Sequence, residues 1–250
     1  MRAIWTGAIG FGLVNIPLKI FSATQENRPD FDLLERDTLS RIRYKRVNED
    51  TGKEVDWEDI VKGSLVKDRY VVLDDSDFEA ASPEKTKLID IQNFVKEADI
   101  DSIYFDSPYF LSPAKGGEKA YSLLLVALKK TKMVGLATFV MRNAESLAVI
   151  RPYNSILLLN TLRFQEQIRQ PDDIKPSAVK IGKAEMDMAV QLIKRHSGPF
   201  NPQDFKDEYS KELKKLIAQK AKGKAPKVRK LKPSASKSSD LLEQLKASLA

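Results

Sequence analysis

The chain of 250 residues contains no cysteine and a single histidine, His196. Without cysteine it can form neither a disulfide framework nor a thiolate zinc site, and a cysteine nucleophile is excluded. We interpret His196 as a cation near a helix C-terminus, because Ser197-Gly198-Pro199 follows it. No run reaches the roughly 18 apolar residues that a membrane span needs. We therefore expect no membrane partner and a cytoplasmic location.

Positive charge is concentrated near the C-terminus. The net charge is +7, but residues 213–250 contain 11 basic and 2 acidic residues, so the preceding 212 residues are slightly acidic. Lysines of this kind bind phosphates in a salt-dependent, sequence-independent way. The candidate DNA-binding residues of this tail are Lys220, Lys222, Lys224, Lys227, Arg229, Lys230 and Lys232. The alternatives are a solubilising tail and, less favoured because no apolar residues interleave the lysines, a membrane-surface tail.

The rest of the chain is mainly β with α additions. Runs of β-branched and aromatic residues predict strands, and an apolar spacing of three and four residues predicts one helix over residues 118–130, opened by a turn at 112–117. Many strands with one internal helix favour a β-barrel body. The predicted strands are residues 3–9, 13–21, 41–47, 70–73, 88–95, 102–105, 133–141, 146–153 and 155–162.

Composition divides the chain into three parts. We expect a core over residues 1–175, a helical C-terminal domain over 176–217 and a lysine-rich flexible tail over 218–250. The tail has too few large apolar residues to fold alone. It ends in a short amphipathic segment that Asp240-Leu241-Leu242-Glu243 opens like a capping box.

Two further basic clusters are candidates for phosphate binding. Arg41, Arg43, Lys45 and Arg46 lie on a predicted strand, where alternate residues share a face. Lys115 and Lys119 flank Gly116-Gly117 at a helix N-terminus, whose free amides and dipole favour an anion. The alternatives are an ordinary solvated face and a simple helix-opening turn. The loop lacks the Gly-Lys-Ser/Thr ending of a P-loop, so ATP is not indicated.

An acidic cluster contains Asp74, Asp75, Asp77 and Glu79. Carboxylates of this kind hold magnesium in some enzymes. No second acidic cluster is identifiable as its partner, so we predict neither a metal nor a catalytic residue.

Several ordered motifs resemble the bacterial Ku family. They cover about residues 1–212, and so many matches in the same order make coincidence very improbable. Besides the opening Met1-Arg2-Ala3-Ile4-Trp5-Thr6-Gly7, they include Ile42-Arg43-Tyr44-Lys45-Arg46-Val47, Asp59-Ile60-Val61-Lys62-Gly63, Lys115-Gly116-Gly117-Glu118-Lys119-Ala120-Tyr121 and Thr161-Leu162-Arg163.

The resemblance implies a homodimer whose barrels and interlocked bridges form a ring around duplex DNA. It also implies non-homologous end joining, a nucleoid-associated location and a ligase partner, the ATP-dependent end-joining DNA ligase, docked by a helical segment from about residue 181 to 213. Arg43, Lys45, Arg46, Lys115 and Lys119 match the family pattern, which makes them candidates for the DNA-facing surface. The chain departs from many bacterial members at residues 48–51, where they carry a pair of cysteines, so a structural zinc is excluded there.

The resulting hypothesis is a non-enzymatic protein, without a cofactor, that binds double-stranded DNA ends. One rival is a general nucleoid or RNA-binding protein that depends on the basic tail. Another is an enzyme acting on nucleic-acid ends, with Asp74, Asp75 and Asp77 as its candidate carboxylates.

Overall fold

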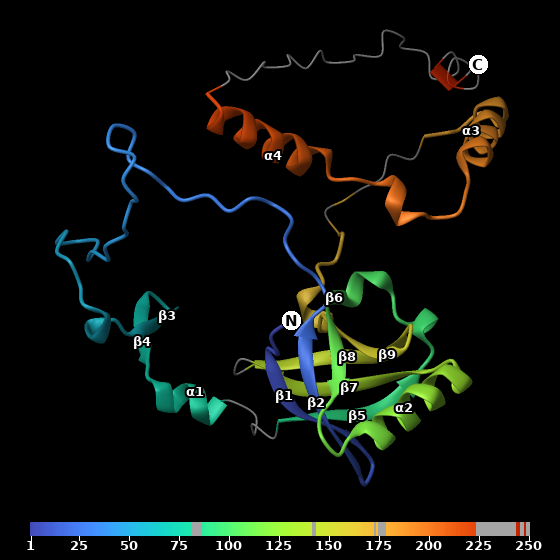
Figure 1. Cartoon of the computed structure of the whole chain (residues 1–250), viewed down its shortest axis with the longest axis horizontal. Coiled ribbons are helices and arrows are strands. Elements are labelled where there is room, and N and C mark those ends of the chain that lie inside the picture. The colour runs from blue at the N-terminus through green and yellow to red at the C-terminus, as the bar shows by residue number, and fades with distance from the viewer. Residues whose placement is uncertain are drawn as a thin grey trace. The chain divides into compact units, whose positions relative to one another are not determined.

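The computed structural model describes residues 1–81, 87–141, 144–172, 174, 179–223, 244–245 and 248 (Figure 1). They fall into two compact units, Met1–Glu26 with Asp32–Gln170 and Asn27–Phe31 with Pro171–Ala250. The expected boundary after residue 175 lies outside the described residues, and the three-part division stays a prediction. None of the described helices is long and apolar enough to cross a membrane.

A closed seven-stranded barrel forms the first unit. Its strand order is β1-β2-β6-β9-β8-β7-β5, and every neighbouring pair is antiparallel except β1 and β5, which close the barrel in parallel. This confirms the mainly β fold with α additions. The strands are β1 (Trp5–Phe11), β2 (Val14–Ser22), β5 (Leu88–Val95), β6 (Phe105–Pro113), β7 (Val134–Met141), β8 (Ala144–Tyr153) and β9 (Ile156–Leu162).

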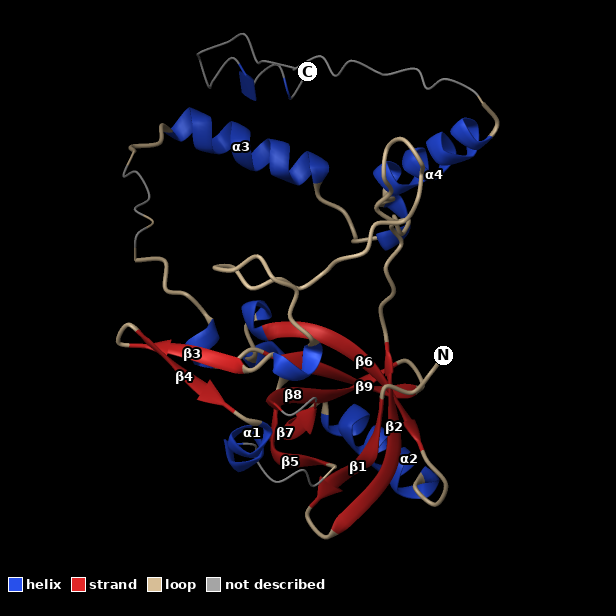
Figure 2. Cartoon of the chain, turned by 90° about the vertical axis from the view of Figure 1, so that its left-hand side faces the viewer, coloured by secondary structure: helices blue, strands red, loops and turns tan. Residues whose placement is uncertain are grey.

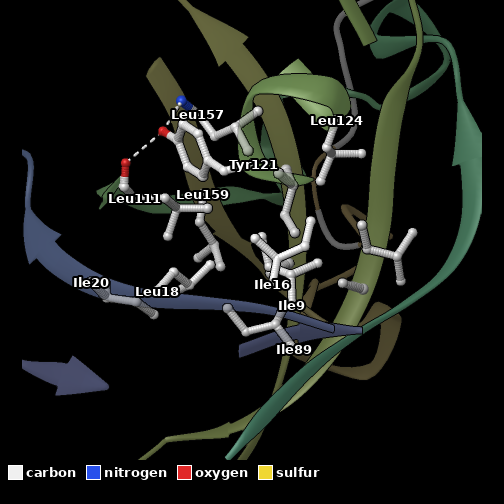
Figure 3. Close-up of a cluster of buried hydrophobic side chains, with 14 of the residues drawn as sticks. Ile9, Ile16, Leu18, Ile20, Ile89, Leu111, Tyr121, Leu124, Leu157 and Leu159 are labelled. Carbon is white, nitrogen blue, oxygen red and sulfur yellow. Dashed lines mark hydrogen bonds between the residues drawn. The ribbon is translucent and has the colours of Figure 1, made fainter. Parts of the chain in front are cut away.

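Helix α2 (Glu118–Thr131) packs its apolar face on the barrel core, as the sequence spacing predicts. Tyr121, Leu124, Leu125 and Leu128 are all buried. They join the branched side chains of the strands, among them Ile9, Ile16 and Leu159, in one cluster (Figure 3). At the centre of this cluster the Tyr121 hydroxyl donates to the Leu111 carbonyl and accepts from the Leu157 amide, both at 2.7 Å. Burial raises the pKa of Tyr121 above its usual value, so the hydroxyl stays neutral.

We expect Tyr121→Phe to lower the free energy of unfolding by about 2–4 kcal/mol, because it leaves a buried amide and a buried carbonyl without their shared partner. Urea unfolding followed by circular dichroism measures this loss. Tyr153→Phe is the matched control, since Tyr153 is 43% exposed. Equal midpoints for the two variants would contradict a structural role for the Tyr121 hydroxyl.

The chain between β2 and β5 forms a long arm, which we define as residues 32–81. It contains a 3-10 turn (Trp57–Asp59), the hairpin of β3 (Lys62–Val66) and β4 (Arg69–Leu73), and helix α1 (Asp75–Ala81) (Figure 2). None of its residues is buried, although large apolar side chains such as Leu65, Tyr70 and Val72 are among them. The arm therefore has no core of its own.

Two predicted strands are wrong. Residues 41–47 are extended but form only isolated bridges at their ends, Leu34 with Arg41 and Val47 with Glu54, because no neighbouring strand supplies a continuous ladder. Residues 102–105 begin instead with a 3-10 turn (Ser102–Tyr104), since the Asp101 side chain accepts from the Ile103 amide and caps it. The predicted turn over 112–117 is also too long, because β6 continues to Pro113.

The remaining short turns and the second unit complete the fold. The 3-10 turns Glu97–Asp99, Gln165–Gln167 and Pro202–Asp204 lie between the longer elements. Helix α3 (Lys183–His196) has no buried residue. In helix α4 (Glu208–Ala221) only Ser210 is buried, and its hydroxyl donates to the capping carboxylate of Asp207. Hydrogen bonds from Ser210 hold the pKa of Asp207 below its usual value.

Candidate nucleic-acid interface

Three of the four arm cations have partners within the arm. Arg41 pairs with Asp32 at 2.8 Å, Lys45 pairs with Glu54 at 2.6 Å, and the Arg46 guanidinium lies 4.4 Å from the centre of the Trp57 ring. Both ion pairs are exposed, with side-chain exposures from 54% to 77%. Exposed pairs contribute only about 0–1 kcal/mol. These cations can therefore exchange their carboxylates for phosphates at little cost.

Arg43 is the candidate without such a partner. Within the described chain it makes no ion pair and no ring contact. Its neighbours in the stretch from Ile42 to Val47 are exposed as well. Because residues 41–47 are not a regular strand, the structure does not show a flat basic face, and the predicted phosphate spacing along it stays a prediction.

A turn after Val47 holds the Lys45 and Glu54 pair in place. The Asn48 carboxamide oxygen accepts from the amides of Asp50 and Thr51 at 3.1 and 3.0 Å, and the Gly52 amide donates to the Asn48 carbonyl. Gly52 adopts φ 65°, the left-handed conformation predicted for it from the sequence. The turn therefore needs no metal to order it.

The loop before α2 is shaped by packing on the barrel, which limits its role as an anion site. The Gly116 amide donates to the Glu118 carboxylate at 2.9 Å, and the Gly117 amide donates to the Ala114 carbonyl at 2.9 Å. A side chain at Gly117 would lie 2.5 Å from the Pro17 carbonyl oxygen. Two of the expected free amides are thus occupied, and the exposed side chains of Lys115 and Lys119 remain the candidates here.

The other tail candidates divide at residue 223. Lys220 lies in the last turn of α4 and Lys222 is its C-cap residue, where a cation also complements the helix dipole. Lys224, Lys227, Arg229, Lys230 and Lys232 lie outside the described residues. Within the described chain, no hydrogen bond or ion pair joins the arm cations to Lys115, Lys119, Lys220 or Lys222, so they form separate candidate surfaces.

The β3–β4 hairpin adds cations that the sequence reasoning missed. Lys62, Lys67 and Arg69 are all exposed, and the Lys62 ammonium lies 4.4 Å from the centre of the Phe78 ring on α1. Lys67 and Asp68 form the tight turn with φ 46° and 65°. The alternation of Leu65 with Val66 and of Tyr70 with Val71 would have revealed the hairpin, but Lys62-Gly63-Ser64 has low strand propensity.

The acidic cluster has a local structural explanation. The Asp74 carboxylate accepts from the Asp77 amide at 3.0 Å, while the Asp77 carboxylate accepts from the Asp74 amide at 2.9 Å. This reciprocal pair begins α1, and a hydrogen bond from the Ser76 hydroxyl contributes most to lowering the pKa of Asp74. Among the described residues, no group of three or more histidines and carboxylates could hold a metal ion.

Comparison with known proteins extends these observations. A family model described as the Ku70/Ku80 β-barrel domain matches residues 10–188. Over 252 residues the chain is 40% identical to the non-homologous end joining protein Ku 1 of Saccharopolyspora erythraea, covering 99% of this chain and 78% of that protein. The protein named Ku from Pseudomonas aeruginosa is 40% identical over 248 residues, covering 97% and 85%, and that from Archaeoglobus fulgidus is 40% identical over 227 residues, covering 90% of each.

A solved structure, the SPOC domain of human PHD-finger protein 3, aligns with a TM-score of 0.30 and 12% identity, covering 64% of this chain and 95% of that chain. The family match includes the whole arm and the loop before α2, but it ends before α4 and the basic tail.

Proposed function

Since this chain belongs to the Ku family, we propose that it binds the ends of double-stranded DNA as a ring-shaped homodimer in non-homologous end joining. The relatives carry end joining in their names. Binding is directed at the phosphate backbone and does not depend on sequence. The protein acts at the nucleoid and has no catalytic role of its own.

The arm carries this proposal, because its apolar residues need a partner. In the β3–β4 hairpin, Leu65 stands opposite Tyr70 and Gly63 opposite Val72, so these four residues share one face. Leu65, Tyr70 and Val72 are 58–74% exposed. The opposite face carries Lys62, which contacts α1 through Phe78. A two-stranded hairpin is marginally stable alone, and a second copy of the chain supplies the surface that covers its open face.

The arm also explains how a nearly neutral body can hold DNA. Two arms closed around a duplex would retain it by topology, so a very high positive charge is not required. Arg43, Lys45 and Arg46 lie on this arm and would meet the phosphates of the enclosed duplex, whatever its sequence.

The helices of the second unit support the proposal of a ligase partner. Met186, Val190 and Ile193 lie at helical spacing on α3 and are 39–67% exposed. An apolar helix face without a partner in its own unit is a docking surface in other complexes. We assign it to the ATP-dependent end-joining DNA ligase, which the protein recruits and stimulates.

The decisive experiment compares a linear duplex with a covalently closed circle of the same sequence, at near-physiological salt with competitor DNA. We expect retention on the linear form alone, because a ring must thread over an end. Equal retention on both forms would overturn the ring and favour a general nucleoid protein driven by its tail. Deleting residues 220–250 separates the two cases, since a ring keeps its end binding while the tail-driven protein loses nearly all binding.

A further inference from the structure

A patch of exposed apolar side chains lies on the barrel, away from the arm in sequence. It includes Phe11 and Leu13 at the β1–β2 turn, Phe94 near the end of β5, and Leu123 and Val126 on α2. Leu13 is completely exposed, and Leu123 and Val126 are 66% and 60% exposed. A contiguous apolar patch, unlike a single exposed leucine, indicates an interaction surface.

A hollow opens within this patch. It is lined by Phe11, Phe94, Leu124, Ala127, Leu128, Thr131 and Met133, and its volume is about 260 Å³. Phe11 and Phe94 form one wall, edge to face, with ring centres 5.5 Å apart. Sites for drug-sized ligands have volumes of about 300–1,000 Å³. This hollow is smaller and apolar, so it suits one or two aliphatic side chains of a peptide.

The charges at its border indicate which peptide would fit. Lys130 and Lys132 stand on either side of Thr131 and are exposed. None of the lining residues is acidic. The complementary partner therefore presents leucine-like side chains next to carboxylates.

The chain itself contains such a segment. Residues 240–249 place Leu241, Leu242, Leu245 and Leu249 at helical spacing, with Asp240 and Glu243 beside them. Of these residues the structure describes Gln244, Leu245 and Ser248 as helical. Residues 223–239 lead to the segment, and a chain of that length spans at most about 55–60 Å when extended. That reach is long enough to bridge two copies.

We propose that the hollow beside α2 binds the C-terminal segment, residues 240–249, of a second copy of this chain. Leucine side chains enter the hollow, and Asp240 and Glu243 pair with Lys130 and Lys132. The contact goes beyond DNA threading and does not rest on it. On two occupied DNA ends it would tether one homodimer to another.

Cysteine crosslinking tests this contact, because the chain has no cysteine of its own. Full-length Ala127→Cys chains are mixed with full-length Ser248→Cys chains and a short bismaleimide, so that only a contact between copies gives a crosslinked heterodimer. Ala127 is exposed at the hollow. We expect this pair to crosslink at least about 10-fold faster than the control pair Ser122→Cys with Ser248→Cys, since Ser122 is exposed on α2 but does not line the hollow.

A second change asks whether the leucines cause the preference. Adding Leu245→Asp to the Ser248→Cys chain should reduce the rate with Ala127→Cys to that of the control pair. Equal rates for the two cysteine pairs, or a preference unaffected by Leu245→Asp, would overturn the proposal. Retention on linear DNA, measured on the same proteins, shows separately whether end binding is intact.

Discussion

Changing Leu65 and Tyr70 together to aspartate is expected to convert the homodimer into monomers and to abolish most retention on linear DNA at near-physiological salt. The two side chains face each other across the β3–β4 hairpin on its open side. Burying a leucine or a large aromatic side chain contributes about 1.5–3 kcal/mol each. Two carboxylates at a dry interface cost more than the loss of that contribution. The dissociation constant of the dimer should therefore rise by at least about 100-fold.

Sedimentation velocity over a range of protein concentrations measures this change. The matched control is Ser64→Asp with Val66→Asp, which adds the same charge to the opposite face of the same hairpin. That control should remain dimeric. A Leu65 and Tyr70 variant that sediments like the unmodified protein would show that the open face does not lie in the dimer, and the arm would need another partner.

Replacing Arg43, Lys45 and Arg46 with glutamine is expected to weaken binding to all duplex sequences alike, by about 10- to 100-fold at near-physiological salt. Each lost phosphate contact lowers the slope of log affinity against log salt by about 0.9. The slope should thus fall by up to about 3. Folding should change little, because Lys45 is an exposed partner and Arg46 lies over an exposed Trp57.

Titration of end-labelled duplexes of two unrelated sequences at several salt concentrations gives both quantities. The control replaces Lys183, Lys194 and Lys211 of helices α3 and α4 with glutamine, which removes the same charge from outside the arm. If the arm variant keeps the affinity and slope of the unmodified protein, the arm cations do not contact DNA. A loss limited to one sequence would contradict backbone recognition.

The barrel could be predicted because its strands carry their own signals. The β-branched runs of β1, β2, β5, β7, β8 and β9 and the amphipathic pattern of α2 agree with the packing that buries them, so local propensity and tertiary structure give the same answer. The order of the strands could not be derived this way. Closure depends on the parallel pairing of Ala8 with Leu88, which no local pattern encodes.

The arm could not be predicted for the opposite reason. Residues 41–47 alternate like a strand, yet backbone amides form a ladder only when a second strand lies beside them. The acidic residues after β4 resembled a metal site, but Asp74 and Asp77 cap a helix. At the candidate interface, the sequence identified the cations, while their partners Asp32, Glu54 and Trp57 emerged only from the structure.

The parallel seam between β1 and β5 gives the arm an unusual freedom to change in length. The chain leaves the barrel after β2 and returns at β5, so the whole arm is one excursion closed by the contact of Ala8 with Leu88. For a flexible loop, doubling the length raises the closure cost by only about 0.6 kcal/mol. No arm residue contributes to the buried core. Insertions and deletions can therefore accumulate between β2 and β5 while the barrel keeps its stability, which lets the span of the arm evolve independently of the domain that carries it.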